Sequence, residues 1–251
     1  MPRAGPIRVG TSGWVYRDWQ GRFYPADLPT SAWFDFFGRH FTTVEINNTF
    51  YRRVSDSVFR AWKAQAPAGF LYAVKASRLL THRKKLIDAA EILPTVLDPA
   101  RLLGPHLGPV LYQLPPRWRC NPARLRSFFE VLPAGFRHVV EFRDPSWYTD
   151  EVKDILGEHG VGFCVHDLKG EGSPVWATGP LGYVRFHGPA ATAYRGRYGK
   201  ARLRKWADRI AEFSAAGREV FAYFNNDVGG AALDEARDLL DLLTAGRAAV
   251  A

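Results

Sequence analysis

Short apolar runs recur along this chain, and several of them end in a cluster of polar or charged residues. The clearest cases lie at 44–48, 139–144, 183–188 and 220–227. A charge inside a strand is costly to bury unless a partner or a ligand satisfies it. A single run of this kind means little. Several runs with their polar groups late in the strand predict a shared site at one end of a sheet.

The alternation of apolar runs and helical spacing predicts the secondary structure. Eight runs predict strands, at 7–12, 42–48, 70–76, 108–114, 138–143, 161–166, 182–188 and 219–226. Helical spacing of apolar residues predicts helices over 55–66, 82–103, 122–132, 147–159, 200–216 and 231–243. Pro94 and Pro99 predict breaks in the second of these helices, and Asn121 predicts the N-cap of the third.

Strands that alternate with helices favour a parallel sheet, because each return to the sheet crosses over on a helix. Eight strands in 251 residues predict a single (β/α)8 TIM barrel formed by one domain over 1–251. The sixth crossover helix is expected to be weak or irregular, since 165–183 is rich in glycine and proline. An open doubly wound sheet is the alternative, although no GxGxxG motif follows the first strand.

The charge balance points to an anionic partner. The chain has 34 Lys and Arg against 25 Asp and Glu, a net charge of +9. Such an excess favours nucleic acid or a phosphorylated or carboxylated small molecule. A compositional bias is the competing explanation, because arginine, alanine, glycine and proline are all abundant.

The cysteines and the apolar stretches bear on location. Cys120 and Cys164 lack CxxC spacing and do not form a disulfide framework, and Cys164 is expected in the core. No apolar stretch approaches a membrane span, and the N-terminus lacks the apolar core of a signal peptide. We therefore expect a cytoplasmic protein with no membrane partner. The oligomeric state is left open.

Polar side chains late in the strands are expected to face the mouth of the barrel at its C-terminal end. Alternation along a strand places four pairs each on one face: Glu45 with Asn47, Glu141 with Arg143, Arg185 with His187, and Tyr223 with Asn225. Lys75, Gln113 and His166 fall late in their own strands and extend the same ring. TIM-barrel interiors are normally apolar, so a polar ring predicts a ligand site.

A series of motifs runs in order from residue 10 to about residue 226. They include Gly10-Thr11-Ser12-Gly13-Trp14, Val44-Glu45-Ile46-Asn47-Asn48, Gln113-Leu114-Pro115-Pro116, Glu141-Phe142-Arg143, Arg185-Phe186-His187-Gly188 and Tyr223-Phe224-Asn225-Asn226. Through these motifs the chain resembles the YecE-like family, a domain of unknown function. The resemblance implies a TIM-barrel fold, similar to the sugar-isomerase and endonuclease-IV-like barrels. It brings no reaction with it.

The first functional hypothesis is an enzyme that acts on a phosphorylated or otherwise anionic small molecule. Glu45 and Glu141 are the candidate acid and base, and His187 is the candidate proton shuttle. The candidate substrate- or anion-binding residues are Asn47, Lys75, Gln113, Arg143, Arg185, Tyr194, Tyr198 and Asn225. The reaction class stays open between hydrolase, lyase and isomerase.

Other readings of the same residues remain open. Glu45 with Lys75, or Glu141 with Arg143, could be a buried ion pair with no chemical role, and 225–230 could be a simple turn. A nucleic-acid-binding protein or nuclease resembling the endonuclease-IV-like barrels is the main alternative. The aromatic residues expected to stack on bases are Trp14, Tyr16, Trp19, Tyr194 and Tyr198. A barrel that binds a ligand without chemistry is a third reading.

A divalent metal is the open question among cofactors. Glu45, Glu141, His166, Asp167 and His187 are residue types that ligate metals. However, HxH spacing is absent, and Lys75, Arg143 and Arg185 would repel a dication. No cofactor is therefore predicted, and a divalent metal stays as an option.

Overall fold

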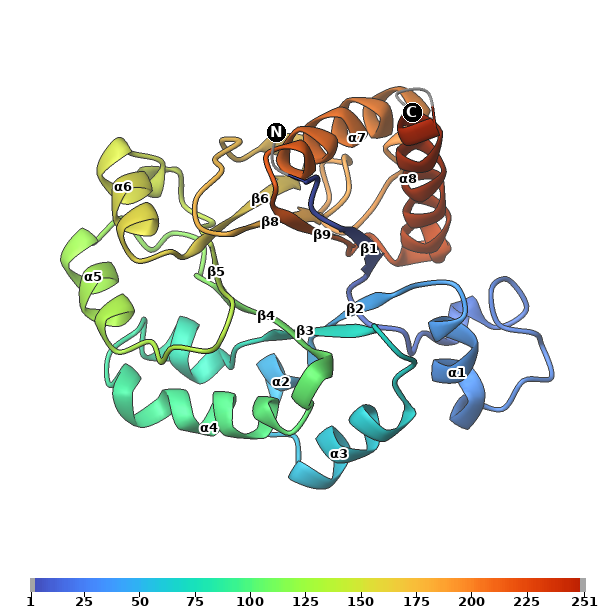
Figure 1. Cartoon of the computed structure of the whole chain (residues 1–251), viewed down its shortest axis with the longest axis horizontal. Helices are drawn as coiled ribbons and strands as arrows, with labels where there is room; N and C mark the ends of the chain where they lie inside the picture. Colours follow the sequence, from blue (N-terminus) through green and yellow to red (C-terminus); the bar gives the residue numbers. More distant parts are fainter. Residues whose placement is uncertain (1–2, 249–251) are drawn as a thin grey trace. The chain divides into compact units, whose positions relative to one another are not determined.

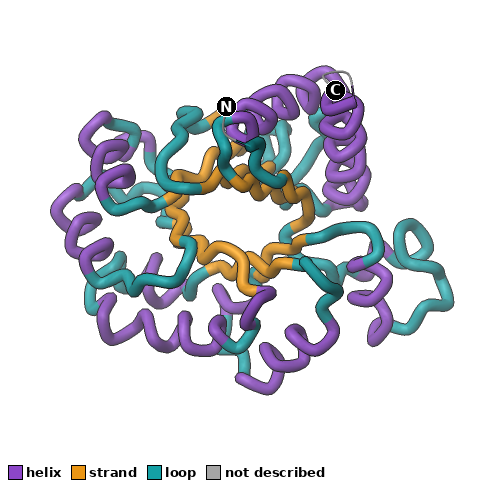
Figure 2. Tube along the Cα trace, in the orientation of Figure 1, coloured by secondary structure: helices purple, strands orange, loops and turns teal. Residues whose placement is uncertain are grey.

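The computed structural model describes residues 3–248. The strands that alternate with helices are β1 (Ile7–Thr11), β2 (Thr43–Ile46), β3 (Leu71–Lys75), β4 (Leu107–Gln113), β5 (His138–Glu141), β6 (Gly162–Leu168), β8 (Leu181–Phe186) and β9 (Glu219–Phe224). The helices are α1 (Trp33–Gly38), α2 (Asn48–Tyr51), α3 (Asp56–Gln65), α4 (Ala89–Arg101), α5 (Pro122–Glu130), α6 (Asp150–Glu158), α7 (Gly199–Ala215) and α8 (Ala231–Ala248). Figure 2 shows this alternation along the chain.

The sheet follows the strand order β1-β9-β8-β6-β5-β4-β3-β2, and the short strand β7 (Glu171–Gly172) pairs antiparallel with β6. The pairs β1–β9, β3–β4, β4–β5, β5–β6 and β8–β9 are parallel. Parallel neighbours that are joined through helices define the (β/α)8 class of TIM-like folds. The predicted fold class is confirmed.

The described chain groups into two compact units. Unit 1 comprises 1–44, 165–173 and 181–251, and unit 2 comprises 45–164 and 174–180. The expectation of one domain over 1–251 stays a prediction.

Unit 2 is built on the parallel strands β3, β4 and β5, with α3 to α6 alongside them (Figure 1). All of β3 and the last six residues of β4 are buried, as expected of parallel strands covered by helices. α5 begins where the sequence predicts, because the Asn121 side chain accepts a hydrogen bond from the Arg124 N–H and Pro122 occupies the first turn. Cys164 is fully buried, as expected for a core residue.

Unit 1 is built on β8, β9 and β1, with α7 and α8 packed on each other and on β9 (Figure 1). α7 buries Leu203, Trp206, Ile210 and Phe213, which confirms the face predicted for 200–216. The Thr43 and Tyr223 hydroxyls form a buried hydrogen bond of 2.6 Å. Gly10 lies so close to the Thr43 carbonyl that a Cβ on it would meet the oxygen at 2.2 Å.

Two details of the chain differ from the sequence prediction. The predicted breaks at Pro94 and Pro99 are wrong, since α4 continues through both prolines and begins only at Ala89. The interruption lies earlier, where the π-helix η3 (Leu79–Arg83) is followed by left-handed residues at Lys85, Leu86 and Asp88.

The irregular sixth crossover is confirmed, because between β6 and β8 the described chain forms the β6–β7 hairpin and loop instead of a helix.

Candidate functional site

Polar residues occupy the carboxyl ends of the unit 2 strands. Lys75, Gln113 and Glu141 are the last residues of β3, β4 and β5, and all three are buried. The register places Gln113 opposite Glu141 and Lys75 opposite Leu111. Glu45, the next-to-last residue of β2, is also fully buried. These polar side chains therefore lie at strand ends, where α/β proteins build their sites.

Glu141 and Arg143 form an ion pair at the end of β5. The side chains are 0% and 6% exposed, so the pair lies almost wholly out of water. The two residues are separated by one position, as the alternation of side chains along the strand predicts. This is the buried ion pair that the sequence allowed as an alternative to a catalytic role, and it holds a guanidinium in a fixed position.

His82 belongs to the same neighbourhood and was not among the predicted site residues. It lies in η3, and its ring packs against Phe50 with 5.0 Å between centroids. Lys75 Nζ lies 4.2 Å from the centroid of the same Phe50 ring. Burial, followed by the charges of Lys75, Arg78 and Arg143, lowers the pKa of His82 to about 4, against the opposing effect of Glu141. The imidazole is therefore neutral at physiological pH.

Unit 1 brings His187 and Asn225 together. Arg185 is fully buried in β8 opposite Tyr223 of β9, and His187 follows one residue after β8, also fully buried. The Asn225 Nδ2 donates to His187 Nδ1 at 3.2 Å. An amide NH2 has no lone pair to offer, so Nδ1 accepts and the proton of the neutral ring lies on Nε2.

Asp167 near the end of β6 is a further polar group of unit 1. It is 9% exposed, and its Oδ1 has no hydrogen-bond partner among residues 3–248. Burial raises its pKa, while Arg202 and the backbone N–H of Gly170 act in the opposite direction. The ring of the preceding His166 lies 6.2 Å from the ring of His187. A buried carboxyl with a raised pKa is a feature of acid/base sites.

The loop after β8 closes on His187. The Tyr194 N–H donates to the His187 carbonyl at 2.6 Å, and Tyr194 is 44% exposed. The hydroxyl of buried Tyr198 accepts from the Gly188 N–H at 3.0 Å. Glu235 of α8 accepts hydrogen bonds from the Tyr198 N–H and from the Asn226 amide. Tyr198 and Glu235 hold the loop in place, and Tyr194 is the member open to solvent.

The predicted site residues divide between the two units. Glu45, Asn47, Lys75, Gln113, Glu141 and Arg143 lie in unit 2, whereas Arg185, His187, Tyr194, Tyr198 and Asn225 lie in unit 1. Within unit 2, Glu141 forms an ion pair with Arg143 and lies opposite Gln113 in the pairing of β4 with β5. Within unit 1 it joins His187 to Asn225 and Tyr194. That both groups line one cup stays a prediction.

Two of the aromatic residues expected to be open for stacking are not. Trp19 is 0% exposed and Tyr198 is 5% exposed, so the expectation of exposure is wrong for both. Trp19 packs against Tyr16, Phe23 and Tyr24 in an aromatic cluster. Sequence alone cannot distinguish aromatic residues in the core from aromatic residues on the surface, because the same residue types occur at similar spacings in both.

Two negative findings concern metals and membranes. Within 3–248, no three His, Cys, Asp or Glu side chains gather closely enough to hold a metal ion. In the same part of the chain, every helix is too short or too polar to cross a bilayer.

The fold and the strand-end residues define a TIM-like α/β protein with polar groups at its strand ends, and the comparisons place it in a family. The family described as "Protein of unknown function DUF72" matches residues 8–250, and the chain belongs to it. The predicted YecE-like membership is therefore confirmed.

Relatives and solved structures agree with this assignment. The chain is 25% identical to the UPF0759 protein YunF of Bacillus subtilis, over 94% of each chain. It is 30% identical to the UPF0759 protein YecE of Escherichia coli, over 57% of this chain and 54% of that protein. A DUF72 family protein from Thermotoga maritima superposes with a TM-score of 0.84 at 28% identity, covering 95% of this chain and 99% of that one. A DUF72 family protein from Enterococcus faecalis superposes with a TM-score of 0.80 at 18% identity, covering 95% of each chain, and shows the shared fold.

Proposed function

We propose that the protein is an enzyme that acts on a phosphorylated or otherwise anionic small molecule by acid/base chemistry at the carboxyl ends of its strands. The observation that carries the proposal is the environment of His82. Burial is the largest cause of its low pKa, and three cations, Lys75, Arg78 and Arg143, lower the pKa further than burial alone, each with a larger effect than the opposing carboxylate of Glu141. A group of cations that is partly shielded from water produces a positive potential, and that potential stabilises a bound anion.

Lys75 and Arg143 are the proposed anion ligands. Both are nearly buried, so their attraction for a phosphate or carboxylate is screened little by water. The guanidinium of Arg143 is fixed by Glu141, which reduces the entropy lost when a ligand binds. A planar guanidinium also offers two parallel hydrogen bonds to an anion. Asn47 and Gln113 supply neutral contacts beside them.

Each unit has its own proposed proton-transfer groups. In unit 2, Glu141 and Glu45 are the carboxylates at the strand ends. In unit 1, His187 is a neutral base or acid with its proton on Nε2, because Asn225 occupies Nδ1. Asp167 joins this set, since burial raises its pKa toward the range in which a carboxyl can donate a proton.

The test is a thermal-shift screen of the protein against phosphorylated and carboxylated metabolites. The screen is then repeated on protein variants in which a proposed anion-binding residue is replaced. A compound that stabilises the native protein is expected to lose its effect in Lys75→Met. Arg126→Ala, which removes an exposed arginine paired with Glu158, is the matched control and is expected to keep the effect. An equal thermal shift in Lys75→Met and Arg126→Ala contradicts the proposed anion site.

The catalytic part of the proposal needs a separate measurement. Once a ligand is known, Glu141→Gln and His187→Gln are assayed for turnover and for binding of the same compound. The proposal expects loss of turnover in both variants, because each substitution removes a proton-transfer group. Binding is expected to be retained in His187→Gln, whereas Glu141→Gln also removes the charge that fixes Arg143. Full turnover in both variants contradicts the assigned roles.

Nucleic-acid binding is the second candidate, and one surface favours it. Lys200, Arg202, Arg204, Lys205 and Arg209 are exposed along α7. A basic helix face of this kind attracts phosphates without reading sequence. The burial of Trp19 and Tyr198 removes two of the proposed stacking platforms, so the small-molecule proposal is preferred. For either function we infer a cytoplasmic location, with which a content of only two cysteines, Cys120 and Cys164, is consistent.

A further inference from the structure

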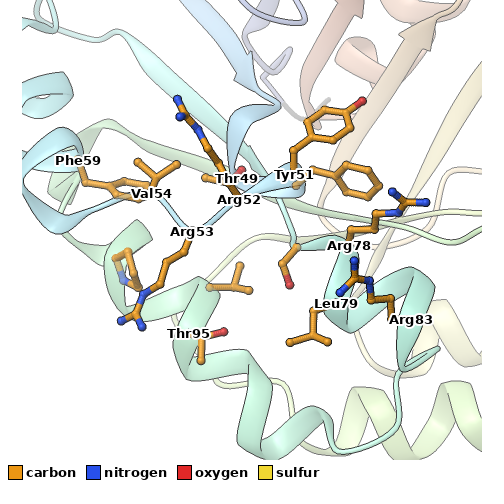
Figure 3. Close-up of a pocket in the computed structure, with 14 residues that line it drawn as sticks. Thr49, Tyr51, Arg52, Arg53, Val54, Phe59, Arg78, Leu79, Arg83 and Thr95 are labelled. Atoms are coloured by element: carbon orange, nitrogen blue, oxygen red, sulfur yellow. The ribbon is translucent and has the colours of Figure 1, made fainter.

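A cavity lies within unit 2, and its lining residues are not among the predicted site residues. Its volume is about 360 Å³, and it opens between the loop after α2, the π-helix η3 and α4 (Figure 3). This volume is at the lower end of the range for small-molecule sites. Phe50 separates it from the strand ends, since the same ring lines the cavity and lies 4.2 Å from Lys75 Nζ.

The charged residues of this cavity are all arginines. Arg52, Arg53, Arg78 and Arg83 line it, and none of its described lining residues is acidic. Within the described chain, none of the four forms an ion pair. In Figure 3, Arg83 and Arg53 lie on opposite sides of the cavity, while the Arg78 guanidinium points outward, away from Arg83, and the Arg52 guanidinium also points away from the cavity. Arg53 and Arg83 thus flank the opening, and no acidic side chain among the described lining residues neutralises them.

The rest of the cavity wall is largely apolar. Phe59 of α3 and Val96 of α4 are nearly buried there, and Val54 is half-buried. Leu79 of η3 also lines the cavity and is 43% exposed. π-Helical turns are rare and occur frequently at functional sites, because they turn side chains that an α-helix would align differently. An apolar wall beside unpaired arginines suits a molecule with one apolar and one anionic end.

We propose that this cavity is a binding site for a small molecule that joins an apolar group, aromatic or branched, to a phosphate dianion. The apolar group packs between Phe59 and Val96, and Arg53 and Arg83 bind the phosphate. The site is separate from the strand-end group and does not depend on the proposed reaction. No predicted site residue lies among those that line it.

The experiment uses 1-naphthyl phosphate, inorganic phosphate and 1-naphthol as probes of the full-length protein, with affinity measured by calorimetry. 1-Naphthyl phosphate is expected to bind more tightly than either of the others, because only it has both ends. Arg83→Ala and Arg53→Ala are each expected to weaken it about tenfold, the effect of one charge-assisted hydrogen bond. Arg52→Ala removes the same charge next to Arg53 and is expected to leave the affinity within about twofold.

A second pair of variants keeps the arginines intact. Leu79→Asp places a carboxylate in the wall of the cavity, and Ile87→Asp places one on a nearby exposed position, 47% exposed, outside the lining. Both positions are exposed, so both variants are expected to fold. Leu79→Asp is expected to weaken 1-naphthyl phosphate by tenfold or more, and Ile87→Asp by much less.

Several results overturn the proposal. They are equal binding of 1-naphthol and 1-naphthyl phosphate, equal loss in Arg52→Ala and Arg83→Ala, or no binding at millimolar concentration. Binding that is lost in Lys75→Met but kept in Arg53→Ala and Arg83→Ala also overturns it, because the phosphate then sits at the strand ends. That last result supports the proposed function, so the failure of one proposal is distinguishable from the failure of the other.

Discussion

The ion pair between Glu141 and Arg143 shows how costly the strand-end group is at the level of single residues. Both side chains are almost completely buried. Removing one partner of a buried pair leaves the other charge without its neutralising contact, typically at a cost of about 3 kcal/mol or more. We therefore predict that Glu141→Gln lowers the free energy of unfolding in urea by about 3 kcal/mol.

The matched control for this prediction is an exposed pair. Arg126 and Glu158 lie 2.7 Å apart with side chains 41% and 54% exposed. Exposed pairs contribute at most about 1 kcal/mol, so Glu158→Gln is expected to change stability by less than that. Similar losses in the two variants would mean that the Glu141–Arg143 pair is solvated rather than buried.

His82 gives a prediction about pH. Burial, followed by the charges of Lys75, Arg78 and Arg143, lowers the pKa of this residue from 6.5 to about 4 in the folded protein. The unfolded chain therefore binds the proton more readily between these values. Its contribution to stability is complete above pH 6.5, falls as the pH drops from 6.5 toward 4, and changes no further below.

The measurement is the titration of the His82 ring by NMR. Arg78→Ala is expected to raise the pKa of His82, because it removes one of the charges that lower it. His82→Asn is expected to reduce the pH dependence of stability in the same window. A ring that titrates near 6.5 in the native protein contradicts the positive field on which the proposed function depends.

At the residue scale, sequence reasoning found the strand ends but not their neighbours. Lys75, Gln113 and Glu141 could be located because a polar residue that closes an apolar run is visible in the sequence. His82 could not, since it lies in a π-helix whose backbone leaves no periodic signal. Its nearness to Lys75 depends on the packing of both on Phe50.

At the scale of elements, α4 shows where propensity loses to packing. The helix contains Pro94 and Pro99, and buries Ile92, Leu93, Val96 and Leu97 on one side. Burial of that face outweighs the loss of two helical hydrogen bonds, which is why the predicted breaks are absent. The strands were easier to predict, because their apolar runs are short and bounded.

Pro94 provides a direct test of that account. Its side chain is exposed, so Pro94→Ala loses little packing and restores a helical N–H. Proline costs about 3 kcal/mol relative to alanine inside a helix, offset by up to about 1 kcal/mol from the unfolded chain. We predict that Pro94→Ala stabilises the protein by about 2 kcal/mol in urea unfolding. A destabilised variant would mean that a kink at Pro94 is needed for packing.

The loop after β8 has a comparable constraint at Gly188. Its φ is +89°, and an added Cβ would meet the Arg195 carbonyl oxygen at 2.2 Å. Gly188→Ala is therefore expected to displace the loop that carries Tyr194, and to lower the melting temperature. Gly21 also has a positive φ, +77°, with nothing within 4 Å of the added Cβ. Gly21→Ala is the control, and an equal effect in the two variants argues against a tight loop at Gly188.

For the whole molecule, the net charge of +9 allows two explanations that one measurement separates. If the exposed face of α7 binds nucleic acid, affinity for DNA or RNA falls steeply and linearly with the logarithm of salt concentration. The small-molecule proposal predicts weak binding of DNA or RNA even at low salt. It also predicts that Lys205→Glu changes the affinity for nucleic acid no more than the loss of general electrostatic attraction does. Strong, salt-dependent binding that is lost in Lys205→Glu favours the nucleic-acid alternative.

The fold class was accessible from the sequence because eight apolar runs separated by helical spacing admit few topologies. The family followed from motifs at the strand ends and in the loops, such as Glu141-Phe142-Arg143. The arginine-lined cavity was not accessible, because Arg53, Arg78 and Arg83 come from three segments without a shared motif. A site formed by residues along strands can be predicted from the sequence pattern. A pocket between helices cannot, because predicting it requires knowledge of how the helices pack.

The central claim is that the strand ends of unit 2 hold an anion. Crystals soaked in selenate and measured at the selenium absorption edge test it most directly. The claim predicts an anomalous peak about 4 Å from Lys75 Nζ or from the Arg143 guanidinium nitrogens, because a selenate oxygen lies between the selenium atom and the donor. Peaks on exposed arginines with none at Lys75 or Arg143, at a saturating selenate concentration, contradict it.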